Sequence, residues 1–520
     1  MKLAIIAATA ALVVSPAHAQ SAPSPAVEAG GLGVVSFENS GNGEAQAPFR
    51  RGLALLHNFE YERAAAEFRR AQAADPGFAM AVWGEAMTHN HPVWMEQDRD
   101  AARGVLAKLG PSAEARARRA GTERERDYLA AAEILYGEGA KEERDFRYED
   151  VMAALHARYP DDVDAAAFHA LSVLGTAHEG RDFAIYMRAA AILEEVFPEH
   201  RHHPGVLHYL IHSYDDPLHA PLGLRAARLY GAVAPDAGHA LHMTTHIFVA
   251  MGMWDDVIAG NEKAIAVVNE QRLASGRGEV YCGHYPSWLV YGYLQRRKID
   301  RARVYIDGCR GPALAELQAR AADSPRPGPD PDNSPAGSYL WVRAMLAANT
   351  GLWTADDDVP LENASATERF QAAYGALLGA NASGDRARLG AAAAELDSLA
   401  PPLLSDLDAD GDTSGARRAA IEATRLQGEA LVKLRSGDAE GGIAILWRAA
   451  EREERAPIEF GPPFVQKPSH ELLGDELMLL GHALDAVSSY ETALARTPGR
   501  TLAIDGLAKA RRAADSRATR

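Results

Sequence analysis

Apolar residues recur along almost the whole chain with the three-to-four-residue spacing of amphipathic helices, and many of them are alanine. Gly, Pro, Asn and Asp interrupt this pattern at intervals of roughly 12 to 18 residues, about the length of one helix and its turn. The alternation of apolar and polar residues that is typical of strands is nearly absent. The pattern therefore predicts an all-α fold built from short helices.

Two stretches, "HHPGVLHYLIHSYDD" (202–216) and "GHALHMTTHIF" (238–248), reveal a period. The pair His208/His212 recurs as His242/His246, 34 residues later (242 − 208 = 246 − 212 = 34). A period of about 34 residues is typical of the tetratricopeptide (TPR) helical hairpin. In TPR repeats, small residues lie where the paired helices touch and a proline lies near the repeat end. The matches are Gly52, Ala64, Phe68, Ala71 and Pro76 early in the chain, and Gly474, Gly481, Ala486, Tyr490, Ala493 and Pro498 late in it.

Weaker copies lie near 238–270, 283–315 and 423–455, and "TLAIDGLAKARRAADSRATR" (501–520) has the polar composition of a capping helix. We therefore predict a TPR-type solenoid of helical hairpins, a right-handed superhelix with a polar C-terminal capping helix. The predicted divisions are a signal peptide (1–19), a flexible arm (20–45), an N-terminal TPR array with a histidine-rich groove (46–321), a Pro/Gly loop (322–337), helical repeats (338–400), an acidic loop (401–415), and C-terminal repeats with their cap (416–520).

The first residues have the features of a secretory signal: Lys2, an apolar run, and the small-residue cleavage site Ala17-His18-Ala19. We expect cleavage after Ala19 and a periplasmic or secreted protein. No later stretch reaches the roughly 18 apolar residues of a membrane span. The formal net charge of −17 argues against nucleic-acid partners.

The paired histidines are the main candidate for chemistry. Residues four apart share a helix face, and the first helices of successive TPR repeats are neighbours lining the groove. His208, His212, His242 and His246 are therefore predicted to meet and to bind a transition metal, either zinc or copper. Two alternatives stay open: a polar groove that binds a peptide or anion, and simple packing. Further possible ligands are His178, His203 and His239, and a weaker second cluster comprises His57, His89 and His91.

Carboxylates near these histidines are candidates for holding a ligand or acting as a base: Asp215, Glu179 and Glu459. Glu459 belongs to the Pro/Gly-rich connector "IEFGPPFVQKPSHELLGDEL" (458–477), which can run across the concave face as an extended segment or simply join two repeats. The motifs of phosphate-binding loops, G-x-S-x-G hydrolases and H-E-x-x-H metalloproteases are absent from the sequence.

The chain has two cysteines, Cys282 and Cys309, near the neighbouring ends of one predicted hairpin. An oxidising compartment favours a disulfide between them. Two buried thiols are the alternative.

The stretches "HHPGVLHYLIHSYDDPLHAPLGLRAA", "GHALHMTTHIFVAMGMWDDVIAGN" and "FGPPFVQKPSHELLGDEL" resemble a set of exported bacterial TPR-repeat proteins over roughly residues 47–513. The resemblance implies the TPR fold and the signal peptide but no particular activity. Two functions follow as hypotheses. One is a metal-binding protein, which becomes a metal-dependent hydrolase or oxidase if an open metal position activates water or oxygen. The other is a metal-free TPR scaffold for a peptide or protein partner. The oligomeric state is not indicated.

Overall fold

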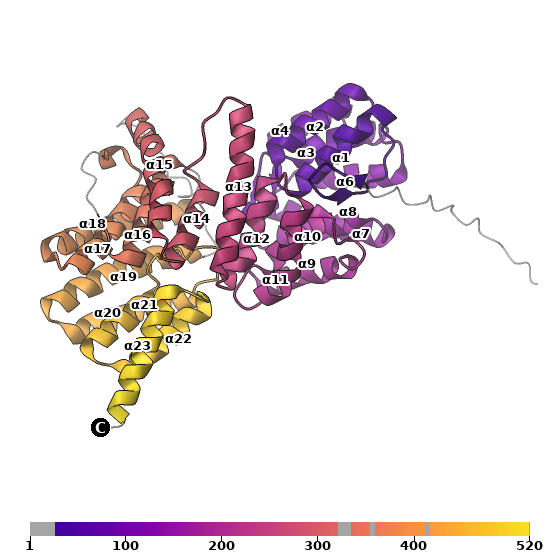
Figure 1. Cartoon of the computed structure of the whole chain (residues 1–520). Coiled ribbons are helices and arrows are strands. Elements are labelled where there is room, and N and C mark those ends of the chain that lie inside the picture. Colours follow the sequence, from indigo (N-terminus) through magenta and orange to yellow (C-terminus); the bar gives the residue numbers. More distant parts are fainter. Residues whose placement is uncertain (1–26, 321–333, 354–358, 411–414, 519–520) are drawn as a thin grey trace, which may run out of the picture.

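A computed structural model describes residues 27–320, 334–353, 359–410 and 415–518. Within these residues the chain is a curved array of α-helices joined by short turns (Figure 1). The strands are two short antiparallel pairs, β1 (Val27–Glu28) with β2 (Val34–Val35) and β3 (Asn90–His91) with β4 (Glu96–Gln97). The all-α prediction is therefore confirmed. The predicted signal peptide lies outside the described residues.

The helices follow one another as neighbours along the chain. In the N-terminal half they are α1 (Gly43–His57), α2 (Tyr61–Ala74), α3 (Ala79–Met87), η1 (Pro92–Trp94), α4 (Arg99–Leu106), η2 (Ala107–Leu109), α5 (Ala113–Ala117), α6 (Glu123–Leu135), α7 (Lys141–Arg158), α8 (Val163–Leu174), α9 (Phe183–Val196), α10 (Pro204–Tyr214), α11 (Ala220–Val233) and α12 (Gly238–Ala250). They continue with α13 (Trp254–Ala274), α14 (His284–Gln295), α15 (Ile299–Ala319), α16 (Pro335–Thr350), η4 (Leu361–Asn363), α17 (Ala366–Ser383), α18 (Arg386–Asp410), α19 (Ala416–Ser436), α20 (Ala439–Arg455), α21 (Ser469–Leu480), α22 (Ala483–Arg496) and α23 (Thr501–Ala518).

The contacts inside the hairpins follow the TPR pattern. In α1 and α2, a Cβ at Gly52 would lie only 3.0 Å from the ring of Phe68, so the small residue lets the bulky one pack against the helix backbone. In α21 and α22, Gly474 has the same relation to Tyr490, at 2.8 Å. The repeat positions inferred from the sequence are therefore the positions at which the helices touch.

Three predicted boundaries differ from the structure. The part of the arm that is described is not loose, because Leu32, Val35 and Phe37 are at most 3% exposed and belong to the core. The segment predicted as an acidic loop is helical as far as Asp410, where α18 ends, despite Pro401 and Pro402. The predicted Pro/Gly loop ends before Pro335, which starts α16.

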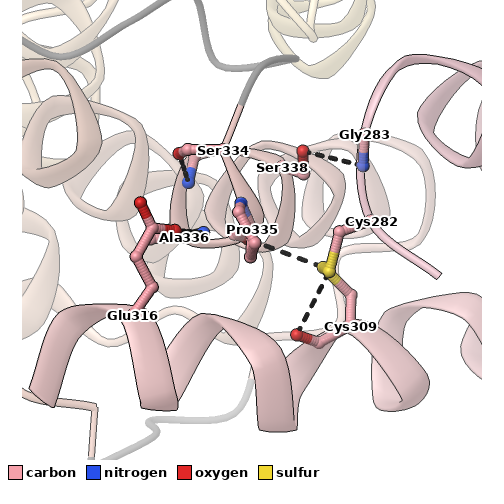
Figure 2. Close-up of a disulfide and its surroundings, with 9 residues drawn as sticks. Cys282, Gly283, Cys309, Glu316, Ser334, Pro335, Ala336 and Ser338 are labelled. Carbon is pink, nitrogen blue, oxygen red and sulfur yellow. Dashed lines mark hydrogen bonds between the residues drawn. A yellow bond between two sulfur atoms is a disulfide. The ribbon is translucent and has the colours of Figure 1, made fainter. Parts of the chain in front are cut away.

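Cys282 and Cys309 form a disulfide that joins the segment before α14 to α15 (Figure 2). Close by, Ser338 in α16 accepts a hydrogen bond from the backbone of Gly283 through its hydroxyl (3.0 Å). The N-terminal end of α14 is thus held by both α15 and α16.

The C-terminal repeats return to the middle of the chain. The turn before α23 touches the turn between α12 and α13: a Cβ at Gly252 would lie 2.6 Å from the Cα of Gly499. The indole N–H of Trp254 donates to the Gly499 carbonyl (2.8 Å). Thr501 bonds to both the backbone and the side chain of Gln295 in α14. The array therefore closes on itself around α12 and α14.

A buried ion-pair network secures this closure. The Arg500 guanidinium donates to both carboxylate oxygens of Glu471 (2.6 and 3.0 Å), to the Tyr291 hydroxyl and to the Gln466 carbonyl. Lys467 adds a second cation 2.9 Å from Glu471. These groups join α21, the connector before it, the start of α23 and α14. Among the described residues, no helix has the length and apolarity that a membrane span requires.

Candidate metal centre

The candidate centre lies where α10, α12 and α14 adjoin. His208 and His212 come from α10, His242 and His246 from α12, and the structure brings all four together as neighbours in the interior, each at most 3% exposed. The predicted open groove is therefore wrong for these residues, because other parts of the chain cover them.

The four histidines divide between two groups, and each group gains a third member. The first group is His208, His212 and His239, and the second is His242, His246 and His284. Within each group, one candidate ligand atom per residue lies within 4.8 Å of the others. The predicted single meeting point of four rings is thus replaced by two meeting points of three rings each.

Hydrogen bonds at Nδ1 set the tautomers of three of these rings. His208 donates to the carbonyl oxygen of His57 (2.6 Å) and His246 to a carboxylate oxygen of Asp215 (2.5 Å). His242 donates to the side-chain oxygen of Asn261 (2.7 Å), whose NH₂ is turned away and donates to the Val257 carbonyl. All three partners are acceptors, so each neutral ring carries its proton on Nδ1 and a lone pair on Nε2.

The lone pairs converge. The Nε2 atoms of His242 and His246 face each other at 3.1 Å. Two lone pairs at this distance repel unless a cation lies between them. Two nitrogens bound to one ion at about 2.0–2.1 Å with tetrahedral angles are about 3.3 Å apart, close to the spacing found here. In the other group the Nε2 atoms of His208, His212 and His239 are buried without a hydrogen-bond partner.

Burial keeps these rings neutral at ordinary pH. Loss of solvent is the largest cause, and it lowers the pKa of His208, His212, His239 and His242 well below 6.5; neighbouring imidazoles lower each of them further. The pKa of His246 is also lowered by burial, although the Asp215 carboxylate opposes this effect. Neutral imidazole is the form that binds metals.

Aromatic side chains enclose the centre. The Phe59 ring, at the turn after α1, lies 4.3 Å from His208, and Trp288 of α14 lies 4.4 Å from His246. Phe460 covers His246 from the connector between α20 and α21 (5.2 Å). A Cβ at Gly461 would meet Trp288 at 2.3 Å, so the connector lies directly on the ring. Of the two arrangements left open for this segment, the structure shows the one in which it covers a histidine, and Asp215, Glu459 and Phe460 line one pocket there.

No protein-family model matches the chain, and no curated protein matches its sequence. The chain is similar to the crystal structure of the APC/C hetero-tetramer Cut9-Hcn1 (15% identity, 91% of this chain and 78% of that chain, TM-score 0.35) and to yeast Tom70 (10% identity, 91% and 89%, TM-score 0.34). At these scores the likeness carries no argument about the site, and the fold described above rests on the chain's own helices.

A third group, His57, Asp164 and His203, has the opposite hydrogen-bond pattern. The Nδ1 of His203 accepts from the Val206 backbone N–H (3.3 Å), so its Nε2 carries the proton and donates to Asp164 (3.2 Å). His57 contacts the same carboxylate oxygen through Nε2 (2.8 Å), and its Nδ1 contacts the Tyr209 hydroxyl. Burial lowers the pKa of His57 to about 4. Because Nε2 of His203 carries a proton that it donates to Asp164, this nitrogen has no lone pair for a metal ion. The group therefore stabilises the fold.

The other predicted residues are dispersed. His57, His89 and His91 do not form one group: His57 joins Asp164, while His91 stacks on Tyr61 (4.1 Å). His178 lies beside Asp145, and Glu179 is exposed. Asp215 contacts the centre through His246. The first helices do approach the centre, but they contribute Phe59 and the His57 carbonyl rather than imidazoles.

His284 is the ligand candidate that the sequence reasoning missed. It lies 42 residues after His242 (284 − 242) instead of 34. The reason is the length of α13, which runs for 21 residues and is followed by a segment that the disulfide fastens to α15. The helix-start pattern "CGHYPSW" was the available signal, since Gly283 has a positive φ of 102° and His284 begins α14.

Proposed function

We propose that this protein is an exported TPR-type protein that binds transition-metal ions, of the zinc or copper kind, through its buried histidines. The observation that carries the proposal is the pair of Nε2 lone pairs of His242 and His246, 3.1 Å apart with both Nδ1 atoms donating elsewhere. Imidazole-only donors suit zinc and copper better than magnesium or calcium, which prefer oxygen ligands.

Three imidazoles for one ion leave a coordination position open, as in catalytic metal sites. An ion held in this way supplies a Lewis acid or a redox centre at the open position. Glu459 and Asp215 line the pocket beside the second group. Asp215 orients His246, and Glu459 is a candidate for the base of a metal-dependent hydrolase or oxidase. The position of Glu179, exposed on the surface, does not support a similar role.

The test is metal content per chain after expression with the signal peptide and purification without chelators. Stoichiometric zinc or copper is expected. Replacement of His208, His212, His242 and His246 by alanine removes it, while His482→Gln on the surface, with its side chain 60% exposed, does not. Wild-type protein without bound metal, after reconstitution with zinc and copper and with unchanged thermal stability, contradicts the proposal.

Export is a part of this proposal that has its own test. The disulfide between Cys282 and Cys309 supports it, since disulfides persist in oxidising compartments. Intact-mass measurement of protein from the periplasmic fraction is expected to show loss of residues 1–19. A full-length chain found in the cytoplasmic fraction contradicts export without affecting the metal site.

In the alternative hypothesis, the protein is a metal-free scaffold and its histidines contact acidic groups of a partner. His208, His212, His242 and His246 are at most 3% exposed, so a peptide does not reach them without rearrangement. The burial therefore favours metal binding for these residues. A peptide or protein partner on another surface of the repeats remains compatible with the fold.

A further inference from the structure

We infer that the centre holds two copper ions, one in each three-histidine group, with a small oxygen ligand such as water, hydroxide or dioxygen between them. This inference rests on the proposed metal binding and goes beyond it, because it fixes the number of ions, the metal and the class of ligand. The observation that supports this inference is that the two three-histidine groups lie next to each other.

Six imidazoles do not fit one ion. Ligand nitrogens at about 2.1 Å from one ion are at most about 4.2 Å apart. In each group of three, the candidate ligand atoms lie within 4.8 Å of one another, whereas the six residues do not form one such set. A single ion bound by the second group leaves the Nε2 atoms of His208, His212 and His239 buried without a partner, which is costly.

The two groups are nevertheless in contact. The ring centres of His212 and His246, which belong to different groups, are 6.1 Å apart, and those of His239 and His242 are 6.3 Å apart. His239 and His242 are also three residues apart on α12, so one helix face supplies both groups. Adjoining three-histidine groups are the arrangement expected of a two-metal site, in which the ions are about 3.5–4 Å apart and one small ligand bridges them.

The charges around the centre favour copper. Asp215 is the carboxylate that contacts a ligand imidazole, and its second oxygen is buried without a hydrogen-bond partner. Arg181 nearby is paired with Asp216, so this pair adds no net negative charge to the interior. Two zinc ions would add a charge of +4 to this interior, while two copper(I) ions add +2. The cost of burying an ion rises steeply with its charge, so the monovalent pair is favoured.

The enclosure limits the ligand to a small molecule. Phe59, Trp288 and Phe460 pack on the rings from three sides. The pocket under the connector, lined by Asp215 and Glu459, adjoins the second group. Bulky substrates are excluded from direct contact with both ions, while water or dioxygen is small enough to lie between them.

The test counts copper in the full-length protein. Anaerobic loading with copper(I), followed by dialysis against a competing chelator, is expected to leave two ions per chain. His239→Gln and His284→Gln each reduce the count to one, because each removes a ligand from one group. His203→Gln, in the histidine–aspartate group, and His482→Gln on the surface leave it at two. Circular dichroism confirms that each variant is folded.

The second measurement asks whether the ions share a ligand. After the copper(I)-loaded protein is oxidised by dioxygen, the electron paramagnetic resonance signal of wild type is expected to account for well under half of the copper, because an anionic oxygen bridge couples the spins and offsets part of the added charge. In His239→Gln the full signal returns for the one remaining ion. Two ions with a full signal overturn the bridge.

The remaining outcomes separate this inference from the proposal beneath it. If wild type holds only one ion per chain, the two-ion site is overturned and metal binding stays intact. The same holds if neither His239→Gln nor His284→Gln changes the number of ions bound. Two zinc ions retained against equimolar copper(I) overturn the choice of metal. No ion under any condition overturns both proposals.

Discussion

The buried carboxylate of Glu471 provides the sharpest quantitative prediction. Burial by itself would raise its pKa, but Arg500 and Lys467 outweigh this effect and lower the pKa from 4.5 to about 2. A depressed carboxylate pKa stabilises the folded state fully above pH 4.5, and this stabilisation is lost as the pH falls to about 2. At about 1.4 kcal/mol for each pKa unit, the contribution is on the order of 3 kcal/mol.

The perturbation is Glu471→Gln, which keeps the shape and removes the charge. It leaves Arg500 and Lys467 buried, with Asp475 near Lys467 as the remaining carboxylate contact (2.6 Å). Removal of one partner from a buried ion pair costs about 3–5 kcal/mol, in agreement with the pKa argument. We therefore expect the free energy of unfolding at pH 7 to fall by about 3 kcal/mol, a large part of the roughly 5–15 kcal/mol that is typical of proteins.

The assay is equilibrium urea unfolding, followed by circular dichroism, at a series of pH values from neutral to strongly acidic. The difference between wild type and Glu471→Gln is expected to be largest above pH 4.5 and to shrink as the wild-type carboxylate becomes protonated. Glu491→Gln is the control, since its pair with Arg511 is more than half exposed and is expected to contribute less than about 1 kcal/mol. A difference that stays constant with pH, or a loss as small as that of the control, refutes the reasoning.

Three further predictions concern the centre and its surroundings. Asp215→Asn weakens the orientation of His246 and is expected to lower metal affinity about 10- to 100-fold in a chelator competition, whereas Asp255→Asn on the surface has no effect; equal affinities contradict the positioning role. Gly461→Ala places a Cβ 2.3 Å from Trp288 at a φ of +86° and is expected to lower the melting temperature more than Gly276→Ala, which has a φ of +73° and open space around it; equal losses show that the contact with Trp288 is unimportant. Replacement of Cys282 and Cys309 by serine opens a loop of 28 residues (309 − 282 + 1) and is expected to cost about 3 kcal/mol in urea unfolding; a reducing agent then destabilises wild type but not the variant.

The sequence predicts the hairpins well because the repeat period is local information. The contacts of Gly52 with Phe68 and of Gly474 with Tyr490 lie where the spacing of small and bulky residues indicates. The period also predicts that His208, His212, His242 and His246 lie on neighbouring helices. It does not predict His284, because the length of α13 shifts the next helix away from the 34-residue register.

The enclosure of the centre depends on long-range contacts that no local pattern encodes. Trp254 and Gly499 are 245 residues apart in sequence, and Arg500 reaches Tyr291 across 209 residues. This closure converts a predicted open groove into an interior. In the same way, Leu32 and Phe37 lie in a segment predicted as a flexible arm, but they are buried against the array.

The return of the C-terminal repeats has a consequence for the order of assembly. A chain made from its N-terminus presents all six imidazoles well before Phe460, which follows His284 by 176 residues (460 − 284). On the proposed metal binding, ions would enter while the rings are accessible, and the completion of the last repeats would then enclose them. Uptake of metal ions by the fully folded protein is expected to be slow. It is expected to be faster in mild urea, because loosening the ion pair between Arg500 and Glu471 exposes the histidines again.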